Sequence, residues 1–162
     1  MTPETASIVT VAAIQARSAP GDIKANLAHG TARVEEAAAP GARVIVLPEL
    51  FTCGYQPNKN VWKSAEAREG RTARWLMDLG RRLGIYIGAG SVEADGTDIF
   101  NVFILADPNG EIVGLAYKAN AEANVFKRGR RKHVIDTPLG HIGIGICADN
   151  QIRLPRPIDA RA

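Results

Sequence analysis

The sequence is poor in cysteine and has no long apolar run. Its two cysteines, Cys53 and Cys147, are too few for a disulfide framework, and each follows a different strand-like run. We therefore expect free thiols in a reducing compartment such as the cytoplasm. No apolar stretch is long enough to span a bilayer. The apolar run at residues 8–14 is short, contains Thr10 and has no basic segment before it, so we expect a first strand and not a signal peptide.

An excess of charge of one sign is also absent. The formal net charge is +3, which does not imply a nucleic acid or membrane partner. The dense basic cluster at residues 127–132 has no aromatic platform or recognition helix beside it, so we interpret it as a solvated loop. The glycines at 140, 143 and 145 open no helix, which excludes a dinucleotide fingerprint. No cluster has metal-ligand spacing, so we expect neither a metal nor an organic cofactor.

The sequence has the composition of an ordinary globular protein, and its predicted elements follow the order of an α/β protein. Its 162 residues are 46% hydrophobic and 23% charged, which fits one domain that buries about 70% of its unfolded surface. A β-α-β-α opening followed by hairpins predicts an α/β layered sandwich with a mixed sheet, and the Asp107–Gly110 turn links two of its strands. The predicted strands are 7–16, 44–47, 85–93, 99–106, 111–118, 133–137 and 141–147, the helices are 21–39 and 71–83, and 51–63 is a loop.

Three residues with chemical potential follow predicted strands. Glu49 comes after residues 44–48, Lys118 after 112–117 and Cys147 after 142–146. In α/β sheets ligands bind outside the carboxyl ends of strands, and a base, a cation and a thiol at one rim suit thiol-based acyl transfer. Each residue also has a structural interpretation. Glu49 could cap a turn, Lys118 could reach out to solvent from a strand end, and Cys147 could be a small buried hydrophobe.

Two observations weigh on these alternatives. The polar residues that follow Cys147 (148–150) place its sulfur at a rim and not deep in a layer. His133 and His141 both begin predicted strands, so they should lie at the opposite end from Cys147, and His29 falls inside a helix. This geometry disfavours a cysteine–histidine pair.

Four segments resemble the nitrilase superfamily of carbon–nitrogen hydrolases. Residues 11–15 resemble its opening strand, 47–55 the segment around its catalytic glutamate, 100–118 the hairpin that leads to its catalytic lysine, and 143–149 its nucleophile segment. The resemblance implies that Glu49 is the base, Lys118 the stabilising cation and Cys147 the nucleophile. Glu122 best matches the family's second glutamate and would orient Lys118 and keep it charged, although the spacing from Lys118 is shorter than usual.

The resemblance also implies a fold and an activity. The fold is a nitrilase-like α-β-β-α sandwich over residues 7–150, followed by an aperiodic tail at 151–162. Family members continue well beyond the cysteine and commonly form dimers, whereas this sequence ends fifteen residues after Cys147, so we expect a sandwich that is incomplete at the C-terminus and a possible homo-oligomer. The implied reaction is hydrolysis of a non-peptide C–N bond in a small amide, nitrile or N-carbamoyl substrate, through a cysteine thioester and without a cofactor.

Two further interpretations stay open. The chain could be an inactive truncated remnant, produced for example by a frameshift, or a non-catalytic partner of this family, because strands without neighbours leave open edges. It could also be a glutamine-amidotransferase-like domain. That class needs a sharp strand-to-helix turn at its cysteine and a histidine at the same rim, and the sequence after Cys147 carries no helix signal.

Overall fold

A five-stranded mixed sheet organises the chain. The computed structural model describes residues 8–56, 58–129 and 134–151. The strand order is β1-β2-β3-β4-β5; β1, β2 and β3 are parallel, and β3, β4 and β5 form antiparallel hairpins. The mixed sheet predicted from the sequence is confirmed. Its strands are β1 (Val11–Ala13), β2 (Val44–Val46), β3 (Tyr86–Asp95), β4 (Asp98–Ala106) and β5 (Ile112–Tyr117).

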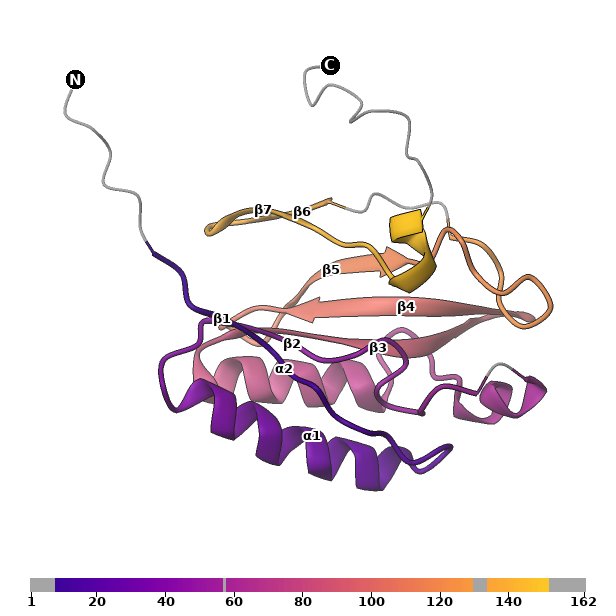
Figure 1. Ribbon diagram of the computed structural model, residues 1–162, viewed down its shortest axis with the longest axis horizontal. Helices are drawn as coiled ribbons and strands as arrows, with labels where there is room; N and C mark the ends of the chain where they lie inside the picture. The colour runs from indigo at the N-terminus through magenta and orange to yellow at the C-terminus, as the bar shows by residue number, and fades with distance from the viewer. Residues whose placement is uncertain (1–7, 57, 130–133, 152–162) are drawn as a thin grey trace, which may run out of the picture.

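Two helices cover one face of this sheet (Figure 1). Helix α1 (Ile23–Ala38) begins at Asp22, whose side chain accepts a hydrogen bond from the Ala25 amide, and α2 (Arg71–Leu83) ends at Gly84 in the left-handed conformation that favours glycine. Both helices lie within a residue or two of their predicted bounds. Their apolar sides pack against the sheet in a core whose members include Val34, Leu76, Leu79, Ile87 and Ile104.

A second, smaller sheet lies over the other face. Strands β6 (Val134–Thr137) and β7 (Gly140–Gly143) form an antiparallel ribbon on the side of the main sheet that faces away from the helices (Figure 1). Ile135 and Ile146 pack there against Phe103, Leu105 and Ala116. The described residues therefore supply one α layer and two β layers of the predicted sandwich. None of the helices within these residues is long and apolar enough to cross a membrane.

Three local predictions differ from the structure. The first strand is only three residues long, and the predicted loop 51–63 contains a 3₁₀ helix, η1 (Lys59–Ser64), which Asn58 caps through the Asn60 amide. Strand β7 stops at Gly143, and Cys147 begins a second 3₁₀ helix, η2 (Cys147–Gln151). The segment after Cys147, whose sequence carries no helix signal, thus forms one short 3₁₀ turn. Residues 130–133, which include the last three residues of the basic cluster, and the tail from 152 lie outside the described residues.

Candidate active site

The directions of the strands bring the predicted site residues to one rim. Two antiparallel pairings relate β3 to β5, so β5 runs in the same direction as β2 and β3. Glu49, which follows β2, and Lys118, which follows β5, therefore emerge at the same edge of the sheet. Their side chains meet there, with Lys118 Nζ 2.7 Å from Glu49 Oε1.

Lys118 is a fully buried cation held between two carboxylates. Its Nζ donates to Glu49 Oε1 and also to Glu122, at 3.1 and 3.3 Å from the two oxygens. Its side chain has no solvent exposure, so the interpretation as a solvent-reaching lysine was wrong. Burial alone lowers the pKa of Lys118, but the hydrogen bonds and charges of Glu49 and Glu122 outweigh burial and hold this pKa above its ordinary value. The ammonium stays charged at neutral pH.

Glu122 contacts Lys118 despite the short spacing between them. The main chain turns at this point, and the Glu122 carbonyl accepts hydrogen bonds from the amides of Val125 and Phe126. Tyr55 also donates to Glu122 Oε1, at 3.1 Å. Burial raises the pKa of Glu122, but hydrogen bonds to its backbone, Lys118 and Tyr55 together hold it below the ordinary value. Glu122 is therefore an anion that can hold Lys118 in place.

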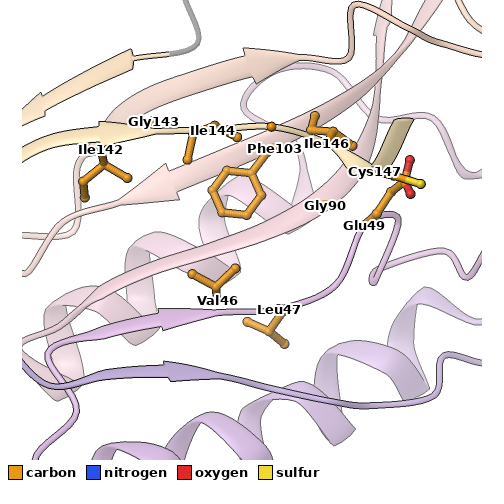
Figure 2. Close-up of a pocket in the computed structure, with 11 residues that line it drawn as sticks. Val46, Leu47, Glu49, Gly90, Phe103, Ile142, Gly143, Ile144, Ile146 and Cys147 are labelled. Atoms are coloured by element: carbon orange, nitrogen blue, oxygen red, sulfur yellow. The ribbon is translucent and has the colours of Figure 1, made fainter. Parts of the chain in front are cut away.

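Cys147 lies at the rim and is exposed to solvent. Its sulfur lies beside the Glu49 carboxylate (Figure 2). The charge of Glu49 raises the pKa of the Cys147 thiol, burial and a hydrogen bond with Glu49 raise it further, and the charge of Lys118 opposes them. The interpretation as a small buried hydrophobe is wrong for Cys147. It holds instead for Cys53, which is fully buried and whose pKa burial raises to about 11.

A buried aspartate, which the sequence analysis missed as a functional residue, holds the Cys147 segment in place. Asp149 Oδ1 accepts hydrogen bonds from the amides of Ala119 and Asn120, at 3.1 and 2.7 Å, and Asp149 Oδ2 accepts from the Ile146 amide at 3.2 Å. Asp149 thereby ties the residues around the thiol to the residues that directly follow Lys118. Its place two residues after the cysteine was the available signal.

Gly90 on β3 lets the Glu49 segment approach the sheet closely. A Cβ built at Gly90 would lie 2.6 Å from Glu49 Cα and would also collide with the amide nitrogen of Leu50. Leu50 itself has a φ of 50°, a backbone that L-residues rarely adopt. The turn that presents Glu49 is therefore packed directly onto the backbone of β3.

A cavity of about 330 Å³ opens at Glu49 and Cys147 and runs between the main sheet and the β6–β7 ribbon. Glu49 and Cys147 lie at one end of it, and apolar side chains form the rest of the wall (Figure 2). Its volume is at the small end of the range for small-molecule sites. The apolar lining includes Val46, Leu47, Phe103, Ile142 and Ile144.

The histidines take no part in this arrangement within the described chain. His141 lies near the start of β7, is exposed and pairs with Asp136 at 2.6 Å; His29 lies on α1, and His133 falls outside the described residues. Strand β7 ends four residues before Cys147 and only a five-residue 3₁₀ helix follows, so the described chain has no direct strand-to-helix turn at the cysteine, and no described histidine lies at its rim. Among the described side chains, no group of three or more His, Cys, Asp or Glu could hold a metal ion.

Comparisons with known proteins agree on one family. The model of the carbon-nitrogen hydrolase family matches residues 10–156. A nitrilase of Pyrococcus abyssi is 35% identical over 124 residues, covering 72% of this chain and 47% of the relative. The omega-amidase NIT2 of Danio rerio is 31% identical over 138 residues, covering 76% of this chain and 49% of the relative.

A solved structure gives the same result for the fold. The crystal structure of Saccharomyces cerevisiae Nit3, a member of branch 10 of the nitrilase superfamily, aligns with a TM-score of 0.75 and 27% identity, over 83% of this chain and 53% of that one. The chain thus spans about half the length of the relatives it matches.

Proposed function

Because the chain belongs to the carbon–nitrogen hydrolase family, we propose that it hydrolyses a non-peptide C–N bond through a covalent intermediate on Cys147. One observation carries the proposal: Lys118 donates hydrogen bonds to both Glu49 and Glu122, and the Cys147 thiol lies beside Glu49 at the end of a cavity. Glu49 is the proposed base, Lys118 the stabilising cation, Cys147 the nucleophile and Glu122 the residue that orients Lys118.

The thiol needs a base in contact with it. The pKa of Cys147 is raised, chiefly by the charge of Glu49, so the sulfur carries its proton at neutral pH. Glu49 accepts this proton as the sulfur attacks the carbonyl carbon of an amide, and a C–S bond forms. The proton then passes from Glu49 to the departing nitrogen, the C–N bond breaks, and ammonia or an amine leaves a thioester on Cys147.

Lys118 and Glu49 serve the remaining steps. The carbonyl oxygen becomes an oxyanion while the carbon is tetrahedral, and the buried ammonium of Lys118 is a fixed positive charge beside that carbon. A water molecule then gives a proton to Glu49 and attacks the thioester. The C–S bond breaks, the carboxylic acid leaves, and the thiol regains its proton from Glu49.

The cavity and the relatives favour a small substrate. The P. abyssi relative is a nitrilase and the D. rerio relative an omega-amidase, so a small amide, nitrile or N-carbamoyl compound is the proposed substrate class. The apolar wall suits an uncharged body between the sheets. Both cysteines are free, which favours a reducing compartment such as the cytoplasm.

Mass spectrometry of the acid-quenched protein tests the proposal. After incubation with small amides, nitriles and N-carbamoyl compounds, we expect the mass of one acyl group on the peptide that contains Cys147, together with release of ammonia. Cys147→Ala should show neither. An adduct on Cys53, or no adduct with any of the three classes, would contradict the proposal.

A further inference from the structure

Asn101 is a buried asparagine whose side-chain amide is hydrogen-bonded at its nitrogen but not at its oxygen. It lies on β4 with 1% of its surface exposed, and its Nδ2 donates to Glu49 Oε1 at 2.7 Å. Its Oδ1 is buried and has no hydrogen-bond partner among the described residues. An unpartnered buried oxygen costs free energy, so folding alone does not favour an amide at this position. The bond to Glu49 is the contact that distinguishes this amide from an apolar side chain.

The bond fixes one oxygen of the carboxylate. Glu49 Oε1 accepts from both Asn101 Nδ2 and Lys118 Nζ, each at 2.7 Å. A carboxylate only accepts hydrogen bonds, so the amide must present its NH₂ group to it. With Oε1 occupied twice, Oε2 is the oxygen left for the thiol of Cys147. The main-chain carbonyl of Asn101 also accepts a hydrogen bond from the Lys118 amide at 2.9 Å, so Asn101 is bonded to both Glu49 and Lys118.

We propose that Asn101 is a positioning residue, which holds the Glu49 carboxylate with one oxygen turned toward Cys147. Among the described residues its side-chain amide bonds only to Glu49, so it acts through Glu49 and not on the substrate. The inference rests on the proposed function of this site. On this proposal, the Asn101 amide and the Lys118 ammonium together fix the position of the Glu49 carboxylate.

The test measures the Cys147 thiol and does not depend on turnover. The full chain is treated with iodoacetamide over a range of pH, and alkylation of Cys147 is followed by mass spectrometry. In Asn101→Ala the Glu49 carboxylate loses one hydrogen-bond donor and is no longer fixed beside the sulfur. Its charge then raises the pKa of the thiol less, so we expect the pH midpoint of alkylation to fall by about half a unit or more. Asn101→Leu keeps nearly the same volume but has no donor, so its midpoint should fall in the same way.

Asn26→Ala is the matched control. Asn26 is 3% exposed and its Nδ2 donates to the carbonyls of Ala19 and Thr52, so its loss removes a buried amide without touching Glu49. We expect a lower free energy of unfolding but the wild-type alkylation profile. If Asn101→Ala does not give a cooperative urea transition, Asn101→Leu decides the question.

Turnover provides the second measurement. Against a hydrolysed substrate, Asn101→Ala should lower kcat about 10- to 100-fold with little change in KM, because a misplaced base affects the chemical step. Shifted midpoints in a chain that hydrolyses nothing would support the positioning role and contradict the proposed function. Wild-type midpoints in both folded Asn101 variants would overturn the positioning role, whatever the turnover.

Discussion

Lys118 shows how much the site depends on single side chains. A buried ammonium is tolerated in a protein interior when it is paired and hydrogen-bonded, and here two carboxylates do this. The same two contacts give Lys118 a fixed place beside Cys147. Stability and the proposed chemistry therefore rest on the same hydrogen bonds, and neither carboxylate can be removed without affecting both.

Replacing Glu49 by glutamine separates thiol reactivity from turnover. The charge of Glu49 is the largest cause of the raised pKa of Cys147, so its removal lowers that pKa toward the ordinary thiol value of 9.0. More thiolate is then present at neutral pH, and iodoacetamide should alkylate Cys147 about 3- to 10-fold faster at about pH 7.5, since one pKa unit is a factor of ten. Hydrolysis should be lost at the same time, because the base is gone.

Glu36→Gln on α1 is the control for this change. Glu36 lies in an exposed pair with Arg33 and should leave the alkylation rate as it is. Slower alkylation in Glu49→Gln, or an unchanged rate, would show that the charge of Glu49 does not act on the sulfur.

At the scale of elements, alternation along the strands separates the site from the helix layer. Lys118 points toward Glu49, while the preceding Tyr117 packs on the helix side and donates to Glu93 Oε1 at 2.8 Å. On β4, Asn101 likewise points toward Glu49, while the preceding Phe100 lies on the helix side, edge-on to Tyr117. A change of register by one residue in β4 or β5 would exchange these partners and empty the site.

Gly90 gives a prediction for the contact between β3 and the Glu49 turn. Gly90→Ala places a Cβ against the backbone of Glu49 and Leu50, which cannot move aside as a side chain can. We expect a loss of about 1–3 kcal/mol in the free energy of unfolding, measured with urea. Gly143→Ala is the control, because a Cβ there meets nothing within 4 Å. Equal stability of the two variants would contradict the close approach.

The main elements could be located from the sequence because their signals are local. The apolar face of α2, Gly84 at its end and the Asp107–Gly110 turn each act within a few residues, and all lie where expected. The 3₁₀ turn at Cys147 depends instead on Asp149, whose partners include Ala119 and Asn120, 30 and 29 residues earlier in the chain. Such a partner is not visible from the residues around the cysteine.

The residues of the candidate site also differ in whether the sequence alone could identify them. Glu49, Lys118 and Cys147 could be identified because each directly follows an apolar strand, and Glu122 because it matched a family pattern. Asn101 and Gly90 were missed, since an asparagine or a glycine within a strand carries no chemical signal until its cross-sheet neighbours are known. Their contacts join segments that are 52 and about 40 residues apart.

At the scale of the whole molecule, the second β layer covers the main sheet unevenly. The β6–β7 ribbon packs over Phe103, Leu105 and Ala116, on β4 and β5. Toward the other edge, Val11 on β1 is 68% exposed and Val46 on β2 is 37% exposed. The cavity therefore has an open, apolar side along β2, which a hydrophobic dye could enter.

Dye binding provides the test at this scale. The native protein should enhance the fluorescence of 1-anilinonaphthalene-8-sulfonate, and Val46→Ser, which places a hydroxyl in the cavity wall, should reduce the enhancement by about half. Val113→Ser is closely matched, because Val113 is 38% exposed but does not line this cavity. Equal fluorescence from the two variants would show that the dye binds elsewhere.

The backbone of Cys147 has a consequence for how this sequence changes over time. Its φ of 47° lies in the left-handed region, where a cysteine costs about 1–2 kcal/mol and a glycine costs almost nothing. Mutation and selection for folding alone would therefore drive this position toward glycine or asparagine. A lineage that ceased to use the thiol would therefore gain stability by replacing Cys147 with glycine.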